Sequence, residues 1–219
     1  MSVTTIPTAG IADGAVDTTQ LADDAVGNTK LDLTANYAFT GTVTGASDAV
    51  LISSSTGGGT ATQQINGCFS STYKYYMVLA NITMSSNAHV FCRFQDSSNA
   101  ELTGGVYYYQ GYQVTNAAGS LSVSGNGDFG GNAFGPNQTL QAASNRFGAY
   151  RLFIYDPFSS STKTNYSLHY TCQAAASNLR TTDVAGVYDT ATSMTGIRFL
   201  TTASSTIGSA STFKVYGFK

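Results

Sequence analysis

A chain of 219 residues in which only 10 % of side chains are charged, against roughly 25 % in ordinary soluble domains, depends on neutral polar groups for its solubility. The net charge is −2 and no cluster of Lys and Arg occurs, which excludes the basic surface of a nucleic-acid-binding protein. No run reaches the roughly 20 apolar residues of a membrane helix, so we expect no membrane insertion.

The N-terminal region contains a ten-residue repeat. Residues 11–20 and 21–30 share a large aliphatic residue at the first position, Ala-Asp at the second and third, and Val at the sixth, and residue 31 begins a third copy. One short repeat cannot bury its apolar side alone, so this stripe must contact another chain, most economically an identical copy. The alternative is a flexible tail with accidental similarity. The stripe consists of Ile11, Val16, Leu21, Val26 and Leu31.

The same region carries most of the negative charge. Residues 1–48 contain six Asp and one Lys, a balance of −5, whereas residues 49–219 contain nine basic and six acidic residues, a balance of +3. Four of these Asp residues offer oxygen ligands for Ca²⁺ when several copies assemble, but the EF-hand pattern is absent. We interpret them as solvated carboxylates and predict neither a metal nor a cofactor. The four are Asp13, Asp17, Asp23 and Asp24.

Residues 34–64 are rich in Thr, Ser and Gly and separate the repeat from the rest of the chain. Residues 37–45 alternate like a strand, and residues 53–59, Ser-Ser-Ser-Thr-Gly-Gly-Gly, are typical of a flexible linker. We therefore expect three parts, namely an extended repetitive stalk over residues 1–33, a linker over 34–64 and a head over 65–219.

From residue 65 onward the sequence predicts an all-β head. Short stretches alternate apolar and polar residues or run through β-branched and aromatic ones, with Ser, Asn and Gly turns between most of them. Seven or eight strands over this length favour a jelly-roll-like β-sandwich. Residues 117–145, rich in Gly, Ser and Asn, indicate long loops or a wide hairpin. The predicted strands are 75–84, 87–95, 105–112, 149–155, 165–172, 194–202 and 212–218.

Several predicted strands are apolar on both faces. Leu152 and Ile154 point to one side of their strand, while Phe153 and Tyr155 point to the other. The second apolar face must be covered either inside the monomer or by another copy. We favour an oligomer interface because an exposed aromatic patch is a liability for a monomer.

Three cysteines occur in the head, and no pair of them has the spacing of a metal site. We interpret Cys68, Cys92 and Cys172 as buried free thiols that act as small hydrophobic residues. A disulfide between Cys92 and Cys172 is the alternative, and sequence alone does not decide between the two.

The head offers little for catalysis. His89 and His169, the only histidines, fall on strand faces opposite the cysteines, where a surface or interface position is expected. No Ser lies in a Gly-x-Ser-x-Gly turn, and most of the six head carboxylates neighbour turn residues, where Asp is ordinarily structural. We therefore predict that the protein is not an enzyme.

Aromatic, amide and carboxylate side chains between residues 107 and 128 indicate a binding surface instead. Aromatic rings stack on the C–H faces of sugars, and polar groups hydrogen bond to sugar hydroxyls. The alternative is that alternate Tyr residues face the core and the loops bind nothing. The candidate glycan-binding residues are Tyr107, Tyr108, Tyr109, Tyr112, Asn126 and Asp128.

Residues 6–33, IPTAGIADGAVDTTQLADDAVGNTKLDL, resemble a recurrent element of bacteriophage fibre and related virion proteins. Those chains carry tandem units with an Ala-Asp-x-Ala-Val core near an N-terminal attachment region. The match departs from the usual form at Asp17 and at Gly27 and Asn28, where Thr is common.

The head is also similar to a known part of such proteins. Residues 73–82, 90–96 and 213–219 resemble strands of the β-sandwich at the C-terminus of many small phage fibre proteins. The two resemblances together imply a homotrimer whose N-terminus is directed towards the virion.

These observations predict a phage virion structural protein that assembles in the host cytoplasm. We expect a trimeric fibre or adhesin subunit whose head contacts the host surface, with itself, tail or capsid proteins and a host glycan as partners. The alternative is a tail or capsid decoration protein that recognises no host. A bacterial lectin is disfavoured because the start of the chain lacks the basic and apolar regions of a signal peptide. The predicted virion-attachment residues are Ile11, Val16, Leu21, Val26 and Leu31.

Overall fold

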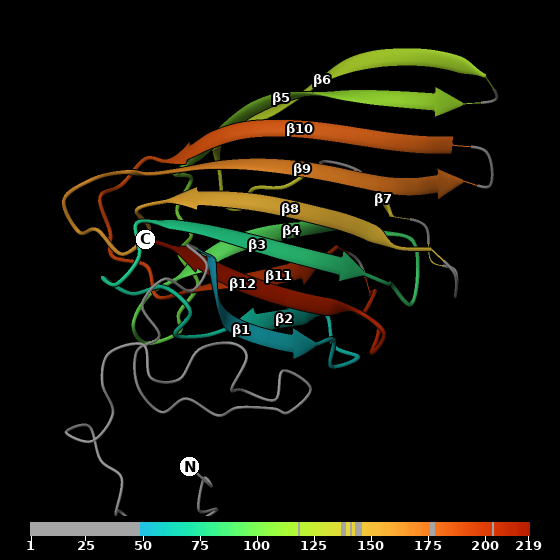
Figure 1. Ribbon diagram of the computed structural model, residues 1–219. Coiled ribbons are helices and arrows are strands. Elements are labelled where there is room, and N and C mark those ends of the chain that lie inside the picture. Colours follow the sequence, from blue (N-terminus) through green and yellow to red (C-terminus); the bar gives the residue numbers. More distant parts are fainter. Residues whose placement is uncertain are drawn as a thin grey trace, which may run out of the picture. The chain divides into compact units, whose positions relative to one another are not determined.

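The computed structural model describes residues 49–219, apart from residues 118, 137–138, 141, 143–145, 176–177 and 203 (Figure 1). The chain divides into two units, Met1–Ala46 and Ser47–Lys219, and the description covers the second. The stalk predicted over residues 1–33 and the strand expected over 37–45 lie outside the described residues. The same is true of the predicted attachment residues Ile11, Val16, Leu21, Val26 and Leu31.

Within the described residues the head contains twelve strands and no helix. Accordingly, this part of the chain has no helix with the length and apolar character needed to cross a membrane. The strands are β1 (Ala49–Thr56), β2 (Thr62–Ile65), β3 (Tyr75–Ile82), β4 (Ala88–Gln95), β5 (Tyr107–Ala117), β6 (Ser120–Gly131), β7 (Thr139–Leu140), β8 (Gly148–Tyr155), β9 (Thr164–Ala175), β10 (Asn178–Tyr188), β11 (Gly196–Thr201) and β12 (Thr212–Phe218).

Eight of the strands pair as the two arms of one long antiparallel hairpin. β1 pairs with β12, β2 with β11, β3 with β8, and β4 with β7. Rolling this hairpin up places β1, β12, β3 and β8 side by side in one sheet and β2, β11, β4 and β7 in the other (Figure 1). This is a jelly-roll arrangement of two antiparallel sheets, so the predicted fold class is confirmed.

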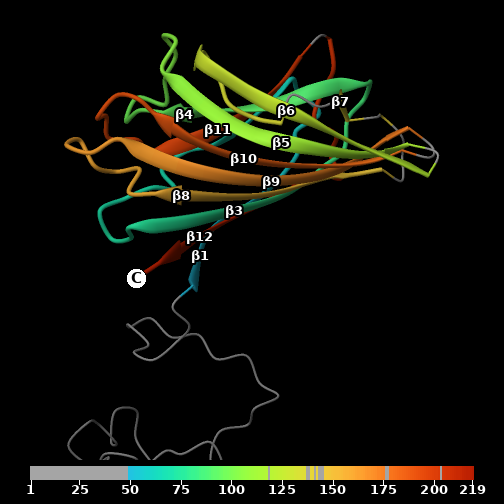
Figure 2. The same ribbon diagram turned by 90° about the horizontal axis from the view of Figure 1, so that it is seen from above.

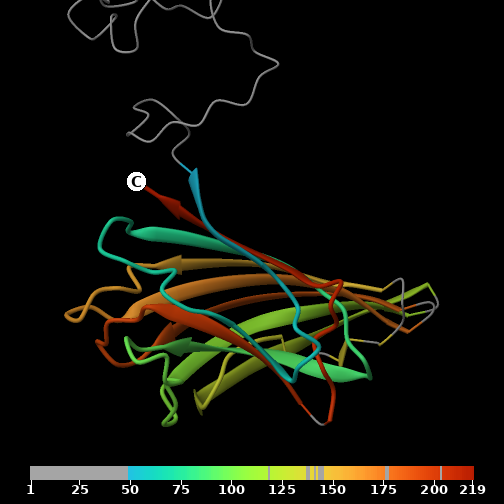
Figure 3. The same ribbon diagram turned by 90° about the horizontal axis from the view of Figure 1, so that it is seen from below.

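Two further hairpins widen one of the sheets. The β5–β6 hairpin is inserted between β4 and β7, and the β9–β10 hairpin between β8 and β11. Both continue the first sheet, whose order becomes β1-β12-β3-β8-β9-β10-β5-β6 (Figures 2 and 3). We call this eight-stranded layer the large sheet and its four-stranded partner the small sheet. β5 and β6 form the wide hairpin that was one of the two predictions for this glycine-rich region.

Alternate residues of the two sheets fill the core between them. In β3, for example, Tyr76, Val78, Ala80 and Ile82 are buried while the residues between them are not. Strands alternate in this way because successive side chains point to opposite faces of a sheet. The core therefore takes one face of strands such as β3, β4, β8 and β12, and the other face of the large sheet points outward.

Four rings, which we call the aromatic cluster, join the two sheets. Phe94 of β4 lies 6.0 Å from Tyr107 of β5 and 5.1 Å from Phe134, measured between ring centroids. Phe134 lies 4.1 Å from Tyr166 of β9, and all four rings are almost fully buried. Each buried ring of this size contributes about 2 kcal/mol or more of burial free energy. The cluster thereby ties the inserted hairpins to the small sheet.

The three cysteines are free and buried, as predicted. Burial raises the pKa of all three thiols, and that of Cys68 reaches about 12. Thiols with raised pKa values hold little reactive thiolate at neutral pH, so these residues act as small core side chains.

The head begins earlier than predicted. The linker expected over residues 34–64 contains two strands of the sandwich: β1 pairs along its length with β12, and β2 pairs with β11. β1 is an edge strand, and only one of its residues, Ile52, packs against the core. Because such a strand needs few apolar residues, its Ser- and Gly-rich sequence resembled that of a linker. The expectation that residue 65 starts the head is therefore wrong.

This correction generates a test by truncation. A fragment over residues 47–219 should melt close to the full-length chain, whereas a fragment over 65–219 lacks the edge strands that cover β12 and β11. We expect the shorter fragment to lose at least about 3 kcal/mol of unfolding free energy, or about 6–12 °C in melting temperature, and to aggregate through its open edges. Thermal denaturation followed by circular dichroism measures this, and equal stability of the two fragments would contradict the pairing.

Candidate functional site

The outer face of the large sheet is divided into an apolar half and a polar half. At the end where β1 begins and the chain terminates, two rows of in-register side chains are apolar or aromatic. Tyr75, Leu51 and Tyr155 are about half exposed there, and the rings of Tyr75 and Tyr155 meet edge to face at 6.0 Å. We call this half the apolar band; it consists of Leu51, Tyr75, Met77, Phe153, Tyr155, Tyr216 and Phe218.

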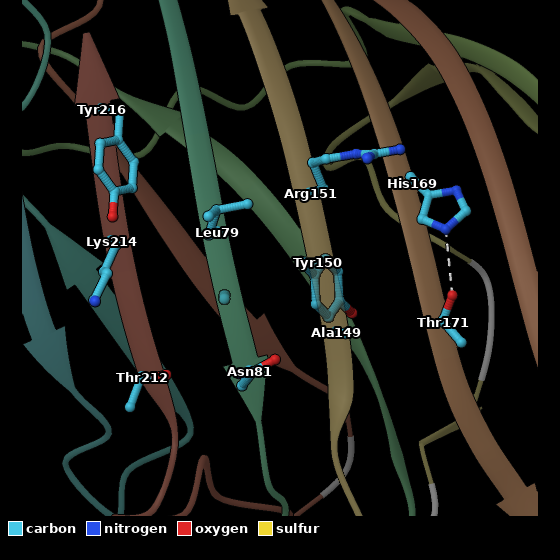
Figure 4. A pocket seen from close by; sticks show the side chains of 11 residues that line it. Leu79, Asn81, Ala149, Tyr150, Arg151, His169, Thr171, Thr212, Lys214 and Tyr216 are labelled. Atoms are coloured by element: carbon cyan, nitrogen blue, oxygen red, sulfur yellow. Dashed lines mark hydrogen bonds between the residues drawn. The ribbon is translucent and has the colours of Figure 1, made fainter. Parts of the chain in front are cut away.

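The next two rows along the same strands are polar and surround a hollow of about 520 Å³, which we call the cationic hollow (Figure 4). Its residues come from four adjacent strands, β12, β3, β8 and β9, because the register of these strands aligns their outward positions. One row is Lys214, Leu79, Arg151 and His169, and the other is Thr212, Asn81, Ala149 and Thr171.

The hollow continues sideways across the inserted strands. A second hollow of about 390 Å³ shares Arg151 and His169 with the first and adds Tyr112 and Asp183. A third, of about 360 Å³, shares Gln110 with the second and lies over β9, β10 and β5. We call the three together the trough. It crosses six strands from β12 to β5, a width of about 24 Å at the usual strand spacing.

His169 is held by hydrogen bonds on both ring nitrogens. Its Nδ1 lies 2.7 Å from Asp183 Oδ1 on β10, and its Nε2 lies 3.3 Å from the hydroxyl of Thr171 (Figure 4). A hydroxyl, an imidazole and a carboxylate in series are the elements of a hydrolase triad, which also needs donors for an oxyanion. β9 is paired on both sides, so its amide groups are committed to the sheet ladders. The backbone of β9 therefore offers no free amide beside Thr171, and the arrangement holds three hydrogen-bonding groups in a fixed order.

The positive charge of the cationic hollow comes from Lys214 and Arg151. They stand two strands apart, about 10 Å between backbones, and the side chain of Leu79 lies between them (Figure 4). None of the side chains that line this hollow is a carboxylate. Asp183, the acidic residue of the trough, belongs to the second hollow and is bound to His169.

The predicted glycan-binding residues do not form one site. Tyr107 and Tyr109 point into the core with 0 % and 6 % of their surface exposed, so assigning them to a binding surface was wrong. The alternation of β5 explains the error, because it sends neighbouring Tyr residues to opposite faces. Tyr108 and Tyr112 do lie on the outer face, where they line the third and second hollows.

Asn126 and Asp128 occupy the inward side of β6, the edge strand, and face away from the trough. Asn126 pairs with Gly111 and is buried, whereas Asp128 pairs with Tyr109 and is exposed. Neither can reach a ligand bound beside Tyr112, so their grouping with the outer-face tyrosines is also wrong.

The sequence interpretation missed Lys214, Arg151, Asn81 and Thr212. Each is an outward position of a strand that was correctly predicted, so the alternation did show which way these side chains point. What it did not show is the register that aligns strands far apart in the chain.

Three comparisons with known proteins add nothing to this description. No protein-family model matches the chain, no curated protein matches it, and no solved structure matches it.

The reassignment of Tyr107 generates a stability test. The amide of Phe94 donates to the Tyr107 hydroxyl at 2.9 Å, and that hydroxyl donates to the carbonyl of Leu102 at 2.9 Å. Tyr107→Phe leaves both groups without this partner and should cost about 1–3 kcal/mol. Tyr112→Phe is the matched control, because Tyr112 is 51 % exposed, and it should change stability by less than about 0.5 kcal/mol. Urea denaturation of both variants measures the difference, and equal effects would argue against the structural role of Tyr107.

Proposed function

We propose that this chain is a bacteriophage fibre subunit that joins the virion through its N-terminal repeat and contacts the host surface through its head. The segment over residues 6–33, which contains the ten-residue repeat and resembles the attachment element of such fibres, carries the proposal. The divided outer face of the large sheet supports it, because a fibre head needs one surface for its own copies and another for its target. The protein would then reside in the virion, with tail or capsid proteins as its partners.

The apolar band supports assembly into a homotrimer. It places seven apolar or aromatic residues side by side on an open sheet face, and three of them are at least 41 % exposed. A contiguous apolar surface of this kind usually marks a protein interface. The band also lies at the end of the head where β1 begins.

The trough supports binding without catalysis. It offers aromatic rings, amides, hydroxyls and charged groups on a rigid sheet, and such groups recognise a carbohydrate surface. The backbone amides of β9 around Thr171 are paired in the sheet ladders and so are not free to bind an oxyanion. We therefore propose that the head recognises a glycan and does not cleave it.

Assembly can be measured by light scattering on the purified protein, which should give about three times 22.8 kDa. Tyr75→Glu puts a charge on the most exposed residue of the apolar band and should weaken association at least about tenfold. Val123→Glu changes an equally apolar residue on the same face, 70 % exposed but distant from the band in the strand order, and should leave the mass unchanged. A stable wild-type monomer at micromolar concentration would refute the trimer.

Attachment can be measured by loading particles that lack this protein. The full chain should join them, and residues 47–219 should remain in solution despite being folded. Particles that carry the full chain should adsorb to the host and release no oligosaccharide from its capsule or lipopolysaccharide. If the head fragment loads onto particles by itself, or the trough is buried against capsid or tail protein, the chain is a decoration protein.

A further inference from the structure

We propose that the cationic hollow binds an anionic group, a carboxylate or a phosphate, of a surface polysaccharide. This inference rests on the proposed function, because it names the chemistry of the ligand that the head would contact. The inference goes beyond the proposed function by assigning the contact to Lys214 and Arg151 and by excluding neutral glycans as the preferred ligand.

The first argument is the contrast between these two cations and four of the seven other basic residues of the head. Four other cations are already paired with carboxylates: Lys74 with Asp156 at 2.9 Å, Lys163 with Asp189 at 2.5 Å, and both Arg93 and Arg198 with Glu101. Lys214 and Arg151 form no ion pair within the described residues.

Lys214 and Arg151 contribute two unneutralised positive charges to one hollow, so both can attract an anion bound there. Both side chains are exposed, and both are long enough to reach a group placed above Leu79. The guanidinium of Arg151 presents a planar set of donors that matches a carboxylate or phosphate with two hydrogen bonds. Lys214 supplies a second, more mobile charge from the opposite side.

The second argument is the row of neutral polar groups beside the cations. Thr212, Asn81 and Thr171 stand in register on β12, β3 and β9, one outward position further along each strand. They line the same hollow as Lys214 and Arg151 (Figure 4). Hydroxyl and amide groups at this place can bind the hydroxyls of a sugar ring whose acidic group points to the cations, while Leu79 packs against its C–H surface.

The third argument is the continuity of the trough. The second hollow shares Arg151 and His169 with the cationic hollow and adds Tyr112, an exposed ring suited to stacking on a further sugar. Asp183 hydrogen bonds to His169, and the imidazole ring of His169 therefore lies between Asp183 on β10 and Arg151 on β8. A chain of sugars can therefore lie across the strands, with its anionic residue over β3 and β8.

The test uses the full-length protein and three probes in isothermal titration calorimetry. An oligogalacturonate carries carboxylates, its fully methyl-esterified form is the neutral match, and a poly(glycerol phosphate) carries phosphates. We expect the wild type to bind one or both acidic probes, and to bind the methyl ester at least tenfold more weakly. Preference for the carboxylate or for the phosphate identifies the source of the anionic group.

The deciding variant is the double change Lys214→Gln and Arg151→Gln, which should weaken binding of the acidic probe at least tenfold. The matched control is the double change Lys74→Gln and Lys163→Gln, which removes the same net charge elsewhere on the head and should leave binding within twofold. All four positions are exposed, so both variants should fold, and their melting temperatures verify this.

Particles that carry the two double variants separate this inference from the proposed function. Loss of adsorption with the hollow variant, but not with the control, supports the inference. Equal binding of acidic and neutral probes, no binding of either acidic probe, or equal effects of the two variants overturns it. In each of those cases normal particle loading, with adsorption still dependent on this protein, leaves the fibre assignment standing.

Discussion

The packing of Phe94 against Tyr107 and Phe134, and of Phe134 against Tyr166, joins the small sheet to the inserted hairpins. A four-stranded sheet is too narrow to cover an eight-stranded sheet completely. The large rings of the aromatic cluster extend the contact between the two sheets to the inserted strands. The Tyr107 hydroxyl adds a polar bond to β4 through the amide of Phe94. The cluster thereby supports the part of the trough that lies over β9, β10 and β5.

The core also decides what the outer face presents. Once alternate residues of each strand are committed to the interior, the remaining ones must stand in rows across the outer face, and the register determines which residues share a row. A shift of one residue would exchange the two faces of a strand. The alignment of Lys214, Leu79 and Arg151 is therefore a consequence of how Val78, Leu152 and Val215 are buried. The same strand register therefore determines both which residues fill the core and which residues line the trough.

The sequence predicted the sandwich because β4, β9 and β12 alternate between apolar and polar residues, while β3 and β8 run through apolar and aromatic ones. It did not predict β10, whose inward positions include Gly186 and Thr182 in place of large apolar residues. Nor did it predict β1, because an edge strand buries little. The candidate site was harder still: Lys214 and Arg151 are distant in the chain and meet only through β3, so no local window of sequence contains them. The local alternation of residues showed which face each side chain occupies, whereas the pairing of distant strands determines which side chains lie next to one another.

The pairing of Ala49 with Phe218 brings the two ends of the head to the same edge of the large sheet. A domain whose two ends lie together can be exchanged as a unit, because any junction with a neighbouring segment falls at one edge of the sheet. A foreign head with the same closing strand pair could be joined to this N-terminal segment, and this head to another N-terminal segment, without rebuilding either partner. For the same reason, a label fused after Lys219 would lie beside the apolar band and at a distance from the far ends of the inserted hairpins. An exchange of this head, natural or designed, therefore has a suitable boundary immediately before β1.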